Sequence, residues 1–284
     1  MRYRYLRFPE GKTKAVTFSY DDGVKADKRL AQIFDKYGMK GTFNINSNRL
    51  KAGNDLTVDE VKECLIARGH EVAVHGENHI APAAVRKACS LREVFFGRLG
   101  LEELLDMTVR GMAYPDSGIR RVDNGNSVEA VKAQLRDMDI AYARTLGGDN
   151  NGFQLPTDFH EWMPTAHHDN PKIYEYIDEF LAINIQKGYC SALWPRLFYI
   201  WGHSFEFDRK NNWEHIEEIC KRLGGKEDTW YATNIEIYDY VKAYESLVVS
   251  LDGSRVYNPT LIKVWFNDDG VLYSVNPGEH IRVD

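Results

Sequence analysis

Short apolar runs alternate with amphipathic stretches along most of the chain. Runs rich in β-branched and aromatic residues predict strands, and apolar residues three or four positions apart predict helices. The strands expected from this pattern are residues 14–20, 41–45, 70–75, 108–114, 140–145, 197–203 and 230–233. The helices expected with them are residues 30–37, 57–69, a segment within 82–106, and residues 126–135, 171–187, 213–223 and 235–241. About seven strand–helix units predict an α/β fold with a parallel sheet, either closed into a barrel or open.

The pattern changes near residue 247, where helical spacing gives way to short strands. We expect these strands at residues 248–251, 255–257, 261–266 and 271–275. Asp252-Gly253 and Asp269-Gly270 are typical of hairpin turns. The chain is therefore predicted to hold a barrel domain over residues 1–245 and a small β-rich extension over residues 246–284. A long irregular stretch is expected over residues 146–170, and loops of that length are often functional.

Composition and charge narrow the classes of function. Hydrophobic residues make up 43% and charged residues 27% of the 284 residues, which is typical of a globular protein. The net charge of -6 and the lack of a basic run argue against nucleic-acid binding. No apolar stretch approaches the length of about 18 residues that membrane insertion needs. The first residues lack the apolar core of a secretory signal, so we expect a cytoplasmic protein, or a secreted one if a signal was removed.

The cysteines do not suggest a zinc site or a disulfide framework. They are scattered and form no Cys-x-x-Cys pair, so reduced thiols are expected at Cys64, Cys89, Cys190 and Cys220. The sequence does not indicate an oligomeric state.

Polar side chains of catalytic types follow several of the predicted strands. The first strand runs into Asp21-Asp22, the third into His75 and His79, the fifth ends near Arg144, and the sixth runs into His203. In a parallel α/β fold these strand ends meet at one face. Two imidazoles and one carboxylate would hold a metal ion and leave it an open position. The second carboxylate could accept a proton, and a histidine opposite could donate one.

Each of these features also has a structural interpretation. Asp-Asp-Gly is often a turn, single histidines are often solvated or hydrogen-bonded in a core, and Arg144 could form an ordinary salt bridge. Their joint occurrence at successive strand ends favours the functional interpretation.

Four segments resemble one known family. Thr17-Phe-Ser-Tyr-Asp-Asp-Gly23, His75-x-x-x-His79, Tyr114-Pro115 and Trp201-Gly-His203 are similar in order and spacing to the motifs of the polysaccharide deacetylases, the carbohydrate esterase family 4 or NodB-homology domain. The resemblance spans about residues 12–245. It implies a distorted (β/α)₇ barrel and one divalent metal ion, most often Zn²⁺, with Co²⁺, Ni²⁺ and Mn²⁺ as alternatives. It further implies removal of N- or O-acetyl groups from sugars.

Carried over to this chain, the resemblance assigns a role to each motif residue. Asp21 resembles the catalytic base and His203 the general acid. Asp22, His75 and His79 resemble the metal ligands.

The chain departs from the family pattern in its supporting residues. Gly76 stands where a Ser or Thr often supports the loop, and Asp116 stands where a tyrosine is usual. Arg144 is the preferred candidate for the arginine that holds the base. The residues expected to bind substrate or support the site are Tyr114, Pro115, Asp116, Arg144, Trp162 and Trp201. Trp162 is interpreted as a sugar platform and His167-His168 as a pocket wall, with a structural role as the alternative for both.

The sequence therefore predicts a metal-dependent hydrolase of acetylated carbohydrates, with N-acetyl groups on amino sugars favoured over O-acetyl groups. A hydrolase of small non-sugar amides or ureides, similar to allantoinases, is the first alternative. A non-catalytic sugar-binding relative is the second, although it would not need both Asp21 and His203. A zinc protease is disfavoured because Gly76, not Glu, follows the first histidine.

Overall fold

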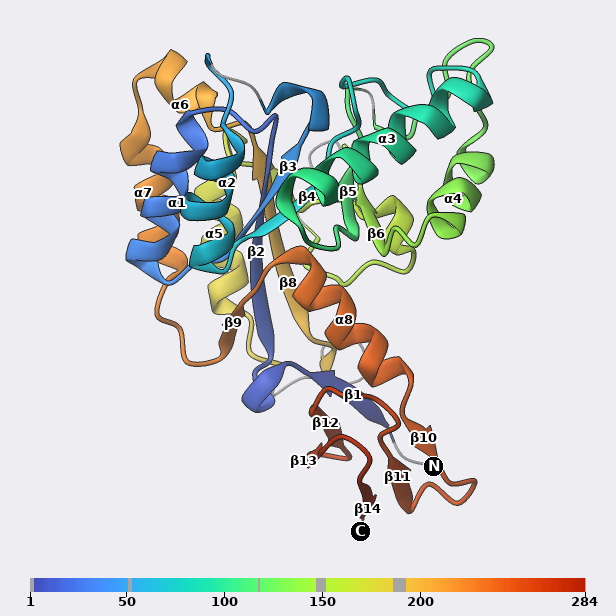
Figure 1. The fold of residues 1–284 in the computed structure, drawn as a ribbon. Helices are drawn as coiled ribbons and strands as arrows, with labels where there is room; N and C mark the ends of the chain where they lie inside the picture. Colours follow the sequence, from blue (N-terminus) through green and yellow to red (C-terminus); the bar gives the residue numbers. More distant parts are fainter. Residues whose placement is uncertain (1–2, 51–52, 117, 147–151, 186–192, 284) are drawn as a thin grey trace.

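A parallel sheet forms the centre of the computed structural model, which describes residues 3–50, 53–116, 118–146, 152–185 and 193–283. Its strand order is β6-β5-β4-β3-β2-β8-β7, and β9 also pairs with β2 (Figure 1). The bounds are β2 (Lys14–Asp21), β3 (Gly41–Ile45), β4 (Glu71–Val74), β5 (Gly111–Ala113), β6 (Tyr142–Arg144), β7 (Ala166–His167), β8 (Arg196–Gly202) and β9 (Thr229–Tyr231). This curled parallel sheet confirms the predicted distorted (β/α)₇ fold class.

The register of β2 with β3 and β8 aligns the carboxyl ends of these three strands. Every residue of β2 is buried, as expected for a parallel strand covered on both faces. Asp21 pairs in register with Asn44 of β3, and Tyr20 pairs with Gly202 of β8. The carboxyl ends of these three strands therefore lie level at one edge of the sheet.

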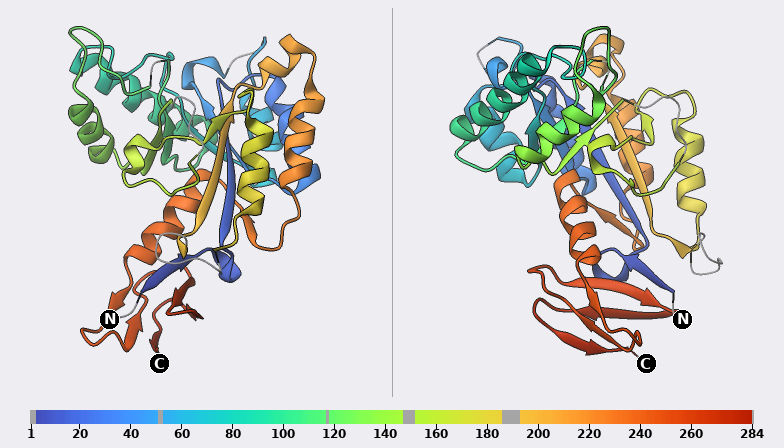
Figure 2. Two further views of the ribbon diagram at one scale, coloured as in Figure 1. Left: turned by 180° about the vertical axis from the view of Figure 1, so that it is seen from behind. Right: turned by 90° about the vertical axis from the view of Figure 1, so that its right-hand side faces the viewer.

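Helices pack side by side in a continuous row along the curled sheet. In Figure 1, α1, α2, α5, α6 and α7 gather at the left and α3 and α4 at the right, and contacts between α2 and α3 join the two groups (Figures 1 and 2). Their bounds are α1 (Ala26–Tyr37), α2 (Val58–Cys64), α3 (Lys87–Leu105), α4 (Val128–Asp137), α5 (Ile173–Ala182), α6 (Phe205–Lys210), α7 (Trp213–Leu223) and α8 (Asn234–Glu245). Short 3-10 helices lie at η1 (Pro9–Gly11), η2 (Ser47–Arg49), η3 (Ile66–Arg68) and η4 (Phe159–Glu161).

Local sequence signals set several of these helix ends. Thr57 and Glu60 form a reciprocal capping box that begins α2. Gly38 ends α1 in the left-handed conformation, with φ of 68°. Both were predicted from the sequence.

Some elements differ from the sequence-based expectation. Strand β7 lies within residues 146–170, which were expected to be irregular, and α5 ends at Ala182 rather than at residue 187, which lies outside the described residues. Strand β5 is shorter than predicted, since only Val74 and Met112 pair it to β4. Helix α6 and two strands near the chain ends were not predicted from the sequence.

Those two strands belong to an antiparallel region at the far end of the sheet. It comprises β1 (Arg4–Arg7), β10 (Val248–Val249), β11 (Arg255–Tyr257), β12 (Val264–Asp268), β13 (Val271–Val275) and β14 (His280–Arg282). These form the sheets β1-β12-β13 and β10-β11-β14. Helix α8 ends at Glu245, yet the first strand of the chain pairs with β12. The domain boundary at residue 245 stays a prediction.

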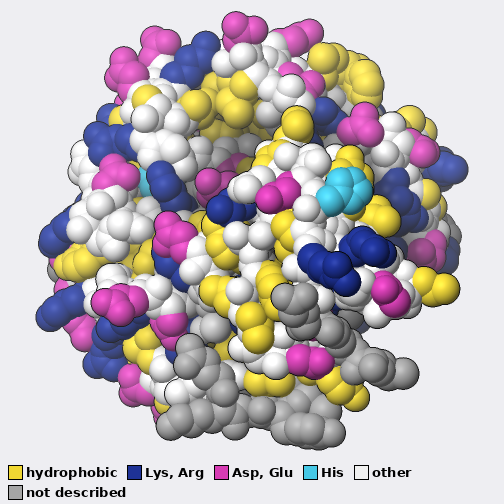
Figure 3. Space-filling model, turned by 90° about the horizontal axis from the view of Figure 1, so that it is seen from below, with side chains coloured by type: hydrophobic (Ala, Val, Ile, Leu, Met, Phe, Trp, Pro, Cys, Tyr) yellow, Lys and Arg dark blue, Asp and Glu magenta, His cyan; other side chains and the backbone are white. Residues whose placement is uncertain are grey.

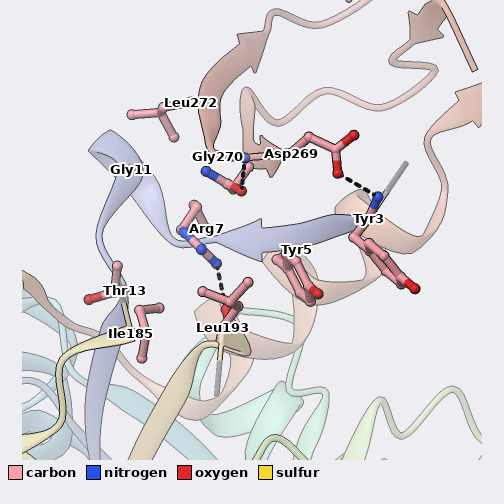
Figure 4. Close-up of a pocket in the computed structure, with 11 residues that line it drawn as sticks. Tyr3, Tyr5, Arg7, Gly11, Thr13, Ile185, Leu193, Asp269, Gly270 and Leu272 are labelled. Atoms are coloured by element: carbon pink, nitrogen blue, oxygen red, sulfur yellow. Dashed lines mark hydrogen bonds between the residues drawn. The ribbon is translucent and has the colours of Figure 1, made fainter. Parts of the chain in front are cut away.

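The antiparallel region also borders a groove of about 660 Å³. There Arg7 Nη1 donates to the carbonyl of Leu193 at 3.1 Å, and the Tyr3 N–H donates to Asp269 Oδ1 at 3.1 Å (Figure 4). None of the predicted catalytic residues lines this groove. Acidic and basic side chains are interspersed over the face seen from below (Figure 3).

Two further sequence expectations concern membranes and thiols. Among the described residues, no helix has both the length and the apolar character needed to cross a membrane. Cys64, Cys89 and Cys220 are free thiols, and Cys190 lies outside the described residues.

Candidate active site

The carboxyl ends of the parallel strands carry most of the predicted site residues. Asp21 is the last residue of β2 and Arg144 the last of β6, while His75 follows β4, Tyr114 follows β5 and His203 follows β8. The fold thus brings residues far apart in the sequence to one edge of the sheet, as expected for a parallel α/β protein.

Asp22, His75 and His79 form a group whose composition suits a divalent metal ion. One ligand-type atom of each lies within 4.8 Å of the others. His75 Nδ1 lies 2.9 Å from the carbonyl of Ala113, to which it can donate, and this leaves the Nε2 lone pair free. Burial lowers the pKa of His75, which favours the neutral imidazole that a metal needs. The residues present therefore fit a metal ion.

Strained backbone places two of these side chains. Asp22 and His79 have φ of 84° and 63°, in the left-handed region that non-glycine residues rarely adopt. Such strain costs free energy and tends to occur at functional sites.

Asp116 lies against this group. Its Oδ1 is 3.6 Å from His79 Nδ1, while Oδ1 of Asp22 is 3.6 Å from His79 Nε2. A carboxylate beside Nδ1 favours the tautomer that presents Nε2 toward Asp22. Asp116 is thus placed to orient His79, a role that the sequence did not predict.

The loop after His75 is supported by a carboxylate from α3. Glu93 Oε1 accepts hydrogen bonds from the N–H groups of Asn78 at 2.7 Å and Ile80 at 3.1 Å. Gly76 has φ of 84°, and a Cβ there would lie 2.4 Å from Glu93 Oε1. Gly76 therefore makes room for Glu93, which supports the loop in place of the hydroxyl that the family pattern led us to expect.

Asp21 is a buried carboxylate held by two partners. Arg144 Nη2 donates to its Oδ2 at 2.5 Å, and Asn44 Nδ2 donates to its Oδ1 at 2.8 Å. Burial alone would raise the pKa of Asp21, but the charges of Arg144, His75 and His203 outweigh it and hold the pKa below its ordinary value. Asp21 is therefore ionised at neutral pH, as a proton acceptor must be.

Arg144 is fully buried, and its guanidinium lies 4.7 Å from the centre of the Trp201 ring. The two residues predicted as supporting the site thus contact each other, and Trp201 covers the arginine that holds Asp21.

His203 lies partly exposed beside Glu206 of α6. Its Nδ1 is 3.7 Å from Glu206 Oε2, and its backbone N–H donates to the same oxygen at 3.3 Å. Burial would lower the pKa of His203, but Glu206 and Asp21 raise it above its ordinary value. A shift in this direction favours the protonated ring, which suits a proton donor.

A buried carboxyl joins the loop of Asp22 to the loop of His203. The Ser204 hydroxyl donates to Asp27 Oδ1 at 2.6 Å, and the Val24 N–H donates to Asp27 Oδ2 at 3.0 Å. Burial raises the pKa of Asp27 to about 8. No sequence signal identified Asp27, Glu206, Glu93 or Asn44, since each acts through a partner distant in the sequence or through a turn.

Other predicted residues are structural. Trp162 is 1% exposed and packs edge-on against Tyr142, Phe159 and Tyr199. The interpretation of Trp162 as a sugar platform is therefore corrected, because its ring has no free face. Tyr114 is equally buried and donates from its hydroxyl to the carbonyl of His160 at 2.9 Å.

Two predicted positions remain near the site. The carbonyl of Pro115 accepts from the Gly118 N–H at 3.2 Å, in a turn that carries Asp116.

The side chains of His167 and His168 lie next to Glu206. The Nε2 atom of each ring is 3.2 Å from Glu206 Oε2. Their rings therefore border the environment of His203.

The chain is similar to known proteins in its sequence, through a family model, and in its fold, through solved structures. Residues 8–142 match the family model described as polysaccharide deacetylase, the family that the motifs resemble. A search of curated proteins found no match.

Solved structures share the fold at low sequence identity. A putative polysaccharide deacetylase from Mycobacterium smegmatis has a TM-score of 0.57 at 16% identity and covers 85% of this chain and 94% of that one. Puue allantoinase has a TM-score of 0.55 at 11% identity, and the match covers 82% of this chain and 91% of that one. A third similar structure is the Xyl-CE4 domain of a multidomain xylanase from the hindgut metagenome of Trinervitermes trinervoides. Its TM-score is 0.51 at 15% identity, and the match covers 82% of this chain and 92% of that one.

Proposed function

We propose that this protein is a metal-dependent hydrolase that removes acetyl groups from amino-sugar-containing oligo- or polysaccharides, N-acetyl in preference to O-acetyl. The match of residues 8–142 to the polysaccharide deacetylase model supports a hydrolase of ester or C–N bonds. The observation that carries the proposal is the position of the ionised Asp21 next to the Asp22–His75–His79 group, with Asp21 Oδ2 3.9 Å from His75 Nε2.

The proposed metal residues are Asp22, His75 and His79, with Zn²⁺ as the preferred ion. When bound, such an ion supplies Lewis acidity, which polarises a carbonyl oxygen and makes water a stronger acid. Asp116 would orient His79 through Nδ1, and the Ala113 carbonyl would orient His75.

Proton transfer is assigned to two other side chains. Asp21 would accept the proton of the attacking water, because Arg144 and Asn44 keep it ionised and fix its orientation. His203 would donate a proton to the leaving amine or alcohol, because Glu206 favours its charged form. The raised pKa of His203 favours its charged form and the lowered pKa of Asp21 favours its ionised form, as the two roles require.

The first test separates base from metal ligand. Asp21→Asn should keep bound metal by elemental analysis but lose acetate release, and unchanged turnover would remove Asp21 as the base. His75→Ala should lose bound metal. His280→Ala, which removes an exposed histidine, is the control and should keep it. Full metal occupancy in His75→Ala would contradict the ligand assignment.

The second test addresses the substrate. The fold is shared with an allantoinase, so fold alone does not separate sugar amides from cyclic ureides. Acetate release from chitin oligomers should exceed release from acetylated xylan, and cyclic ureides should not be hydrolysed. Ureide hydrolysis without deacetylation would establish the alternative function instead.

A further inference from the structure

A second group of metal-ligand side chains lies between the end of β7 and α6. His167 is the last residue of β7, His168 and Asp169 follow it, and Glu206 lies in α6. One ligand-type atom from each of these residues lies within 4.8 Å of the other three. The proposed hydrolysis gives His168 and Asp169 no role.

The distances in this group resemble those between ligands around one ion. His168 Nε2 is 3.2 Å from both Asp169 Oδ2 and Glu206 Oε2. Neighbouring ligand atoms of a tetrahedral zinc ion are about 3.3 Å apart, because each lies about 2.0 Å from the metal. Charge-assisted N–H···O hydrogen bonds are usually shorter, at about 2.7–2.9 Å.

His168 is the strongest indication that the group is built for a cation. Its side chain has no exposed surface, and its Nε2 has no hydrogen-bond partner of acceptable geometry. Its Nδ1 lies 3.2 Å from the Tyr20 hydroxyl, which can accept the ring proton. Nε2 then presents a lone pair to two carboxylates, an arrangement that is repulsive unless a cation lies between them.

The hydrogen bonds of His167 give it a different role. Its Nδ1 accepts from the Asp169 N–H at 3.1 Å, so the neutral ring carries its proton on Nε2. That nitrogen lies 3.2 Å from Glu206 Oε2 and can donate to it. His167 therefore orients Glu206 and is not itself a ligand.

We propose that His168 Nε2, Asp169 Oδ2 and Glu206 Oε2 form a second site for a divalent transition-metal ion, separate from Asp22, His75 and His79. One imidazole and two carboxylates suit zinc or manganese. An ion there would join the segment after β7 to α6. By offsetting the charge of Glu206, it would weaken the support that Glu206 gives to the charged form of His203. The ammonium group of Lys210 contacts Asp169 Oδ2 and competes with the ion for that oxygen.

Zinc stoichiometry tests the proposal directly. Protein stripped with a chelator and reloaded with zinc should hold about two equivalents by elemental analysis. Asp169→Asn and Glu206→Gln should each hold about one, and so should His75→Ala, which affects the other site. Glu214→Gln, an exposed carboxylate change in α7, should keep both. Circular dichroism establishes that each variant is folded, and Asp169→Asn is the mildest change because Asp169 is partly exposed.

A second variant should raise zinc affinity instead of lowering it. Lys210→Gln removes the competing cation and should tighten zinc binding at the second site severalfold in a titration. One equivalent in the wild type, unaffected by Asp169→Asn and Lys210→Gln, would overturn the proposal and leave a hydrogen-bonded cluster. Failure of the proposed function would look different, as absent acetate release from protein that still holds both equivalents.

Discussion

Arg144 and Asp21 form a buried ion pair in which Nη2 donates to Oδ2 at 2.5 Å. They come from the ends of β6 and β2, which are separated in the sheet by three other strands. The arginine therefore reaches across the strand ends to hold the proposed base. Because both side chains are buried, neither charge can be compensated by water if the other is removed.

Arg144→Met should both destabilise the protein and alter its pH dependence. Loss of the partner leaves Asp21 as an uncompensated buried charge, which costs about 3–5 kcal/mol in denaturant unfolding. The pKa of Asp21 should rise, so the acid limb of kcat/KM should move to higher pH. The control is Arg110→Met, which breaks a half-exposed pair with Asp239 and should cost less than about 1 kcal/mol. Equal losses in the two variants would contradict a special role for Arg144.

Gly76→Ala should weaken the loop that carries the proposed metal ligands. The new Cβ meets Glu93 Oε1 at 2.4 Å in addition to the strain of φ at 84°. Gly38→Ala is a matched control, because Gly38 has φ of 68° but nothing within 4 Å of its added Cβ. In the control, the free energy of unfolding should fall only by the cost of the left-handed backbone conformation, about 1–3 kcal/mol. Gly76→Ala should lose more and bind zinc less tightly, whereas equal unfolding free energies would show that Glu93 can move away freely.

Asp116→Asn should lower metal affinity without unfolding the protein. Asparagine tolerates the left-handed backbone at this position, where φ is 52°, so the change removes mainly the charge next to His79 Nδ1. Loss of such a partner typically costs 10–100-fold in metal affinity, as an order of magnitude. Zinc titration against a chromophoric chelator measures the affinity. Asp106→Asn, a helix-end aspartate that is also left-handed, is the control and should leave the affinity unchanged.

Glu71 should make stability fall as the pH rises toward neutrality. Burial raises its pKa from 4.5 to about 7, although Tyr142, the Ile235 N–H and Thr42 donate hydrogen bonds to it. The folded protein therefore holds a proton that the unfolded chain releases, and each such proton lowers stability by about 1.4 kcal/mol per pH unit within that window.

Glu71→Gln carries no titratable proton at this position. Its unfolding free energy should consequently fall less steeply than that of the wild type between about pH 5 and pH 7. Parallel pH dependences for the two proteins would show that Glu71 is ionised throughout this range.

The sequence predicts the strands that matter most because their signals are local. The buried run that forms β2, the capping box at Thr57 and the hairpin turn at Asp269-Gly270 each lie within a few residues. The motif residues at the strand ends come together for the same reason, since parallel strands place their carboxyl ends on one side.

The supporting residues depend on contacts that no local pattern contains. Glu93 reaches the loop after His75 from the middle of α3, and Trp162 is buried by rings from three other segments. Among the described residues, strand β1 pairs only with β12, more than two hundred and fifty residues later in the sequence. Such pairings have no signature within a window of one strand or helix.

The pairing of β1 with β12 also bears on how the protein can be handled. Both chain ends lie beside this antiparallel region, at the opposite end of the sheet from the strand ends that carry Asp21 and His203 (Figure 1). Affinity tags or surface anchors attached at either end would therefore stay away from the strand ends that carry the proposed site. Removing the last β-strands to obtain a shorter enzyme would instead strip the partner from β1 and expose its edge to association with other chains.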